Sequence, residues 1–338
     1  MASTNINFNN TCPSVAKAKN TQQNFQLAAN QKLQQKQQLQ QNVYNLSKVT
    51  TIFFDLDNTL TPTRSGDSKA CRKVSERLEI QYGFTKDEAN YATQNFLKSF
   101  RRCPDNAQTP LDTWRTHLWR ESLPPKYKQF AESIYPLWLE MRYCYLAIPD
   151  DYIKMLMRFR QAKYRLALIT NGPSNAQWEK IRKLRVQPYF DCVLVSADLP
   201  WEKPDPNIFY AACKYLNVQP DECIMIGDKL ESDIKGGNLA GLAATFWLPL
   251  TPDAIKDLNN DGDVDHKPTH ILRNLLDLYK YFNFNIQQQI NEEQQVPVYN
   301  SQSNHKYRRT GDSLPTTIDY LISSETDNSS ENSSDSIN

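Results

Sequence analysis

With 338 residues and a formal net charge of +1 at pH 7, the chain gives no electrostatic reason to expect a nucleic acid or an anionic membrane as a partner. Its seven cysteines are odd in number and form no C-x-x-C pair, which argues against a disulfide framework and against a zinc site. No apolar stretch approaches the length of a membrane span, so we expect a reducing, cytoplasmic compartment.

Both ends of the chain are polar segments of low complexity. Residues 1–46 are rich in Gln and Asn, and residues 284–338 are rich in Ser, Asn and Gln. Neither segment can bury enough apolar surface to offset the entropy lost on ordering, so both are predicted to be disordered tails. The tails remain candidates for binding protein partners.

Between the tails, short apolar runs are typical of buried β-strands. Helical patterns fill the gaps between the later runs, and such alternation indicates βαβ units and a parallel sheet in an α/β fold. The predicted strands are Thr51–Phe54, Tyr164–Ile169, Val193–Val195, Cys223–Ile226, Ala244–Trp247 and a weaker one at Thr269–Leu272.

One gap contains no strand pattern. From residue 65 to residue 148 the sequence holds only helical stretches rich in Trp, Tyr, Leu and charged residues. This pattern predicts a helical domain inserted after the first strand. Ligands bind outside the carboxyl ends of the strands in open α/β sheets, and a domain placed there can exclude water from the site.

Acidic, hydroxyl and basic side chains follow the predicted strands or open the next helix. A parallel sheet would bring them to one crevice, although two acids after a strand are equally compatible with a simple acidic turn. These residues are Asp55 and Asp57 after the first strand, Thr170 and Asn171 after the second, Lys203 before a proline, and Asp228 and Asp233 after "CIMI".

Together these residue types suit the hydrolysis of a phosphate monoester. A carboxylate such as Asp55 can attack phosphorus and form an aspartyl-phosphate, provided that the negative charge is offset. Asp55 and Asp228 can hold Mg²⁺, Lys203 adds a second positive charge, and the Thr170 hydroxyl can donate to a phosphate oxygen. Asp57 can protonate the leaving group and then accept a proton from the attacking water.

The ordered motifs D-x-D-x-T, S/T, K-P and G-D-x-x-x-x-D, over about residues 49–283, resemble the haloacid dehalogenase superfamily of phosphatases. The resemblance implies a Rossmann-like parallel sheet core at residues 47–64 and 149–283, with an all-helical cap at residues 65–148. It also implies Mg²⁺ as cofactor and a small phosphorylated sugar as substrate. The implied roles are nucleophile for Asp55, acid/base for Asp57, metal ligands from Asp55, Asp228 and the Asp57 carbonyl, a phosphate site at Leu56, Asp57, Thr170, Asn171 and Lys203, and support of the metal by Asp233.

The cap sequence offers candidates for substrate recognition. The stretches "RTHLW" (Arg115–Trp119) and "YPLWLEMR" (Tyr135–Arg142) resemble caps of superfamily members that act on N-acylneuraminate 9-phosphate. We expect Arg115 and Arg142 to hold the carboxylate of such a substrate and Trp119 to pack against the sugar. Alternatively, the tryptophans fill the core of the cap and the arginine stems cover it.

Other interpretations remain open. The same fold could serve another small sugar phosphate, as a phosphatase or a phosphomutase, and the tails could make the chain an interaction scaffold. The chain also departs from the family at Lys229, where a lysine directly after Asp228 adds a positive charge beside the expected metal.

Overall fold

The computed structural model describes residues 46–102, 109–255, 266–282 and 284. The two expected tails therefore lie outside the described residues, apart from their innermost positions. Among the described helices, none combines the length and the apolar character that crossing a bilayer requires. The cytoplasmic location stays a prediction.

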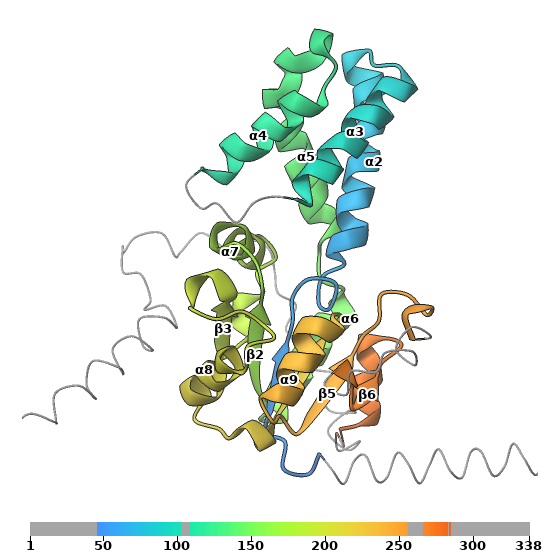
Figure 1. Ribbon diagram of the computed structural model, residues 1–338. Coiled ribbons are helices and arrows are strands. Elements are labelled where there is room, and N and C mark those ends of the chain that lie inside the picture. The colour runs from blue at the N-terminus through green and yellow to red at the C-terminus, as the bar shows by residue number, and fades with distance from the viewer. Residues whose placement is uncertain (1–45, 103–108, 256–265, 283, 285–338) are drawn as a thin grey trace, which may run out of the picture. The chain divides into compact units, whose positions relative to one another are not determined.

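A six-stranded parallel sheet in the order β3-β2-β1-β4-β5-β6 organises the fold (Figure 1). All six predicted strands are present, which confirms the α/β class. Their bounds are β1 Thr51–Phe54, β2 Arg165–Thr170, β3 Cys192–Val195, β4 Cys223–Gly227, β5 Ala244–Trp247 and β6 His270–Ile271.

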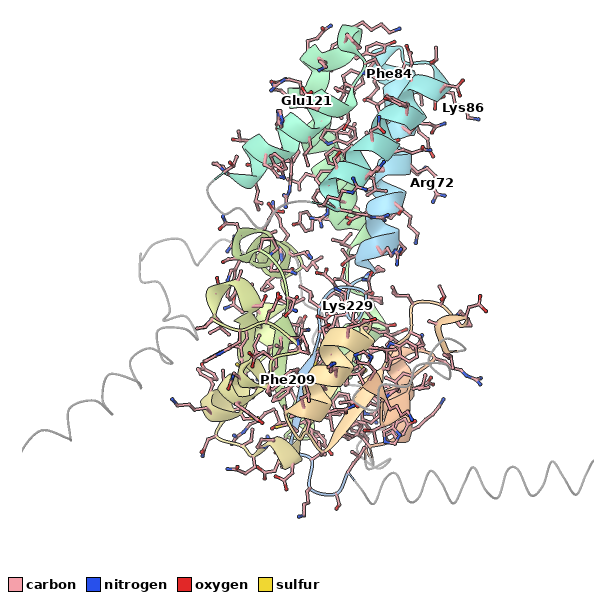
Figure 2. All side chains as sticks on the ribbon, viewed as in Figure 1. Arg72, Phe84, Lys86, Glu121, Phe209 and Lys229 are labelled. Atoms are coloured by element: carbon pink, nitrogen blue, oxygen red, sulfur yellow. The ribbon has the colours of Figure 1, made fainter. Side chains whose placement is uncertain are left out.

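Strand β1 is interior to the sheet because β2 and β4 pair with its two edges. Its apolar run is explained by burial on both faces: Phe53 contacts Phe209 (labelled in Figure 2), and Phe54 contacts Phe190. The strand order reverses beside β1, since the chain proceeds from β1 outward to β3 and then returns to β4 on the other side. In α/β sheets a ligand crevice opens at such a point.

Helices follow or precede the strands of this core. Helix α8 packs against β2 and β3, α6 against β2, and α9 against β5. Ile208 and Phe209 of α8 join the buried cluster on one face of the sheet. The bounds are α6 Asp150–Gln161, α7 Ser174–Lys183, α8 Pro206–Leu216, the π-helical turn η5 Leu230–Ile234, α9 Lys235–Leu239, and short 3₁₀ turns at Gln187–Tyr189, Ser196–Asp198, Pro220–Glu222 and Leu275–Lys280.

Between β1 and β2 the described part of the chain contains helices but no further strand, and the first four of its α-helices build a hydrophobic core of their own. At its centre Phe96 stacks on Trp119, with 3.9 Å between ring centroids, and meets Trp138 edge-on. The division into a core and a cap at residues 65–148 remains a prediction. The bounds are α2 Thr63–Tyr82, α3 Lys86–Phe100, α4 Leu111–Ser122, the 3₁₀ helix η1 Pro125–Phe130 and α5 Ala131–Tyr145.

Candidate active site

Three buried carboxylates meet where β1 and β4 end. Asp55, Asp228 and Asp233 each offer an oxygen that lies within 4.8 Å of the other two. The parallel pairing of the two strands produces this proximity, because the Asp55 amide donates to the carbonyl of Ile226 at 2.9 Å. Gly227 makes room for the group, since a Cβ there would lie 2.2 Å from the Asp233 carboxylate.

Burial, and after it the proximity of other carboxylates, makes two of these acids reluctant to ionise. Burial, together with the charge of Asp233, raises the pKa of Asp55 to about 6 despite the opposing charge of Lys203. Burial, then Asp55 and Asp233, raises the pKa of Asp228 to about 7. One oxygen of Asp228 is buried and has no hydrogen-bond partner within the part of the chain that the structure describes. Buried, mutually repelling carboxylate oxygens of this kind fit a hard divalent cation such as Mg²⁺.

Lys203 supplies the positive charge inside this group. Its ammonium nitrogen lies 2.7 Å from an oxygen of Asp55, from an oxygen of Asp233 and from the carbonyl of Ile169. Burial alone would lower the pKa of Lys203, but Asp233 and Asp55 raise it well above its usual range, so the side chain is a cation. Asn171 fixes the backbone of Lys203, because its amide donates to the Lys203 carbonyl at 2.7 Å and its oxygen accepts from the Lys203 amide at 3.0 Å.

Asp57 is held by three side chains. Lys180 places its ammonium nitrogen 2.6 Å from both carboxylate oxygens, Gln177 donates to one of them at 3.0 Å, and the Thr63 hydroxyl donates to the other. Burial opposes ionisation of Asp57, yet Lys180 and these hydrogen bonds keep its pKa well below the usual range. In this arrangement Asp57 is a carboxylate, and it has to take up a proton before it can donate one.

Two other predicted phosphate-site residues, Thr170 and Leu56, follow or end strands of the sheet. Thr170 ends β2, and its buried hydroxyl has no hydrogen-bond partner among the described residues, so it can donate to an anion. Leu56 has a fully buried side chain and can serve an anion only through its backbone.

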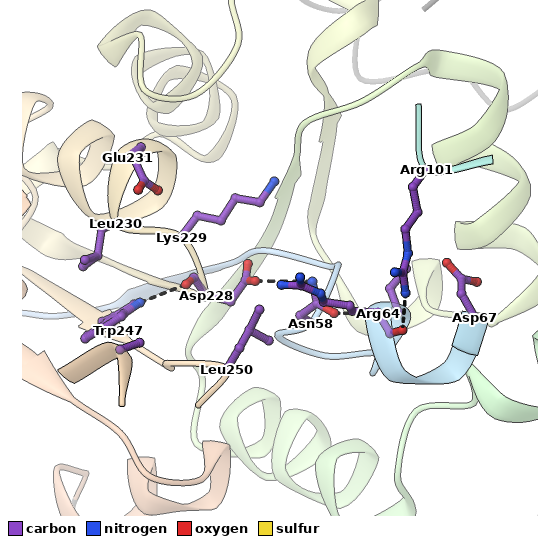
Figure 3. A pocket seen from close by; sticks show the side chains of 12 residues that line it. Asn58, Arg64, Asp67, Arg101, Asp228, Lys229, Leu230, Glu231, Trp247 and Leu250 are labelled. Atoms are coloured by element: carbon purple, nitrogen blue, oxygen red, sulfur yellow. Dashed lines mark hydrogen bonds between the residues drawn. The ribbon is translucent and has the colours of Figure 1, made fainter. Parts of the chain in front are cut away.

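A cavity of about 710 Å³ adjoins Asp228. Asn58 donates to one Asp228 oxygen at 3.3 Å, and the Trp247 indole donates to the Asp228 carbonyl at 2.8 Å, so both residues fix Asp228 at the cavity wall (Figure 3). The lining also contains three cations: Arg64, Arg101 and Lys229.

The three cap candidates do not line this cavity. Arg115 is buried and lies 2.8 and 2.9 Å from the carboxylate oxygens of Glu179. Arg142 is buried and donates to Asp67 at 2.8 Å. Trp119 is fully buried within the cap cluster. These positions agree with the alternative in which such side chains build and cover the cap core, and a substrate-contacting role for them stays a prediction.

The sequence model of haloacid dehalogenase-like hydrolases matches residues 49–241, which is more than half of the chain. The chain belongs to the haloacid dehalogenase-like hydrolases. The predicted superfamily is thereby confirmed.

Several proteins are similar to this haloacid dehalogenase-like hydrolase. The chain is 36% identical over 208 residues to N-acylneuraminate-9-phosphatase of Homo sapiens, which covers 60% of this chain and 84% of that protein. It is 31% identical over 226 residues to glyceraldehyde 3-phosphate phosphatase of Pyrococcus furiosus. That match covers 67% of this chain and 91% of the other protein. Among solved structures, the HAD-hydrolase YfnB of Bacillus subtilis is 24% identical to this chain, with a TM-score of 0.45. The match covers 70% of this chain and 99% of YfnB.

Five residues described above that position the acids of this haloacid dehalogenase-like hydrolase were not predicted as site residues: Asn58, Thr63, Trp247, Gln177 and Lys180. A signal existed for Gln177 and Lys180, because they are three residues apart in α7, the helix that follows β2, and therefore share a face of that helix. Asn58 lies inside the D-x-D-x-T motif, but its contact with Asp228 joins residues 170 positions apart. Sequence spacing alone does not indicate such a contact.

Proposed function

We propose that the chain is a Mg²⁺-dependent phosphomonoesterase that forms an aspartyl-phosphate on Asp55. The observation that carries the proposal is the buried group of Asp55, Lys203, Asp228 and Asp233 at the carboxyl ends of parallel strands. A nucleophile, a fixed cation and spare carboxylate oxygens are what transfer of a phosphoryl group requires.

The reaction proceeds in two steps, formation of the aspartyl-phosphate and its hydrolysis. Asp57 first takes a proton from solvent. A carboxylate oxygen of Asp55 then attacks phosphorus while the bond from phosphorus to the ester oxygen breaks, and Asp57 gives its proton to that leaving oxygen. Water then attacks the phosphorus of the aspartyl-phosphate, Asp57 takes a proton from it, and Asp55 and inorganic phosphate are released. In both steps the positive charge of Lys203 offsets the charge of the phosphate oxygens, and the Thr170 hydroxyl donates a hydrogen bond to one of them. Because Lys180 stabilises the carboxylate form of Asp57, that contact weakens when Asp57 serves as the acid.

Asp55, Asp228 and the backbone carbonyl of Asp57 would hold Mg²⁺, with Asp233 in support. When bound, the ion supplies positive charge that allows a carboxylate to approach a phosphate dianion. The unpartnered oxygen of Asp228 and the raised pKa values of Asp55 and Asp228 support this assignment.

We expect Mg²⁺ binding to weaken as the pH falls from 8 to 5. Below about pH 7 Asp228, and below about pH 6 Asp55, holds a proton that the metal must displace. The apparent dissociation constant should therefore rise by about tenfold or more over this range. Titration calorimetry in buffers of matched ionic strength measures it, and Asp228→Asn should abolish most of the binding. An affinity independent of pH would contradict the ligand assignment.

The raised pKa values of Asp55 and Asp228 also make the stability of the metal-free protein depend on pH. The pKa of each acid is raised above its usual 3.8, so the folded state binds more protons than the unfolded state between that value and about 7. The contribution of these two acids to stability accordingly falls as the pH rises through this window. Mg²⁺ should raise the unfolding temperature more at pH 8 than at pH 5.

As substrate we propose N-acylneuraminate 9-phosphate. The 36% identity to the human N-acylneuraminate-9-phosphatase, across 84% of that protein, supports this choice. The test is a panel with and without Mg²⁺ that contains N-acetylneuraminate 9-phosphate, glyceraldehyde 3-phosphate and neutral hexose phosphates. We expect the highest kcat/KM for the first compound. A preference of about a thousandfold for another compound, equivalent to about 4 kcal/mol, would overturn the substrate but leave the reaction class intact.

A further inference from the structure

The cavity beside Asp228 is rich in cations that come from separate parts of the chain. Arg64 lies in the first turn of α2, Arg101 follows the end of α3, and Lys229 follows β4. A second cavity shares Asn58, Arg64 and Arg101 with the first and adds Lys69 and Arg72 of α2 to the positive lining. The positive charge is thus continuous from the carboxylate group along one side of α2.

The backbone around these cations is held by specific contacts. The Arg64 amide donates to the Asn58 side chain at 2.8 Å, and Asn58 in turn contacts Asp228. Arg101 donates to the Arg64 carbonyl at 3.0 Å and to the Ser68 hydroxyl at 2.9 Å. Through Asn58, these contacts connect the backbone of Arg64 to the proposed metal ligand Asp228, as Figure 3 shows.

Two of the cationic side chains, those of Arg64 and Lys229, face solvent. Within the described ranges neither the guanidinium of Arg64 nor the ammonium of Lys229 makes a hydrogen bond or an ion pair. The Lys229 backbone is nevertheless fixed, because its amide donates to Asp233 at 3.0 Å. Figure 3 shows the Lys229 side chain extended from that fixed backbone.

The acids of the cavity do not balance these cations. Asp67 is already paired with Arg142 at 2.8 Å, and Asp228 is a proposed metal ligand. Among the lining residues this leaves Glu231 against Arg64, Arg101 and Lys229. A surplus of positive charge, with guanidinium groups that can form paired hydrogen bonds, is suited to a carboxylate.

We propose that this cavity binds a carboxylate on the part of the substrate remote from the phosphate, and that Arg64 and Lys229 determine specificity for phosphorylated sugar acids. The inference rests on the proposed phosphatase reaction at Asp55. The cavity volume of about 710 Å³ is ample for a sugar of this size. Arg64 and Lys229 therefore take the place of the cap arginines as our candidates for carboxylate recognition.

The first test compares Arg64→Gln with the native protein on two substrates, N-acetylneuraminate 9-phosphate and p-nitrophenyl phosphate, which lacks a carboxylate. We expect the ratio of the two kcat/KM values to fall by about 10- to 100-fold, mainly through a higher KM for the sugar acid. Lys229→Gln should shift the ratio in the same direction. Arg77→Gln is the matched control, because Arg77 is an exposed arginine of the same helix that lines neither cavity.

A second measurement keeps this inference separate from the proposed function. N-acetylneuraminate should inhibit p-nitrophenyl phosphate hydrolysis by the native protein at least about tenfold more strongly than its methyl ester, and Arg64→Gln should remove the difference. Equal inhibition by acid and ester, or a selectivity ratio unchanged in Arg64→Gln, would overturn the carboxylate site and leave the phosphatase intact. Failure to hydrolyse any phosphomonoester would instead overturn the proposed function.

Discussion

Replacing Asp55 with asparagine is expected to reduce phosphatase turnover by at least about 10⁴-fold, since the loss of one member of a catalytic set can abolish nearly all its effect. The amide of asparagine is nearly the same size as the carboxylate but is a poor nucleophile. Steady-state release of inorganic phosphate measures the effect. The substitution also removes one charge from a crowded buried group, so the variant should fold at least as stably as the native protein.

Asp57→Asn provides the matched comparison for this result. With p-nitrophenyl phosphate, whose leaving group needs little protonation, the first step should persist while hydrolysis of the intermediate slows. Intact-protein mass spectrometry after rapid acid quenching should therefore detect a phosphoryl adduct on Asp57→Asn, located at Asp55 by peptide mapping. Turnover near the native rate in Asp55→Asn, or an adduct on another residue, would refute the assignment of the nucleophile.

Replacing Lys203 with methionine is expected to destabilise the metal-free protein by about 3–5 kcal/mol at pH 8, because it leaves two buried carboxylates without their cation. Lys203 lies 2.7 Å from oxygens of both Asp55 and Asp233. Urea unfolding in the presence of EDTA measures the loss. The loss should be smaller at pH 5, where protons can neutralise the unpaired acids.

A double variant distinguishes the loss of the ion pair from the loss of packing. Asp233→Asn combined with Lys203→Met removes one of the two stranded charges, so the double variant should be more stable than Lys203→Met alone. Lys154→Met, at an exposed position of α6, controls for the general effect of the substitution and should change stability by less than about 0.5 kcal/mol. Equal losses of unfolding free energy in Lys203→Met and Lys154→Met would show that the buried ion pair contributes nothing to stability.

The strands and the main site residues could be predicted because their signals are local. A strand such as β1 is apolar at every position since both of its faces are buried, and Asp55 follows immediately after it. Parallel pairing then places the end of β1 beside the end of β4, so the proximity of Asp55 and Asp228 follows from topology alone.

The roles of the arginines could not be read in the same way. Arg115 and Arg142 are of the right type for a carboxylate, but their partners are Glu179 and Asp67, which are 64 and 75 residues away in the sequence. Helix packing decides which arginine meets an internal acid and which, like Arg64, is left facing a cavity. No spacing rule within one helix contains that information.

Gly227 shows how narrowly the site tolerates variation at a residue that has no functional group. Alanine there would put a methyl carbon 2.2 Å from the Asp233 carboxylate, which already binds Lys203 and the amide of Lys229. The smallest change that relieves this clash is a displacement of the Asp233 carboxylate, which would separate it from Lys203 and from the proposed metal ligands Asp55 and Asp228. A single glycine-to-alanine substitution could thus abolish the activity of the enzyme although every polar residue of the motifs is retained.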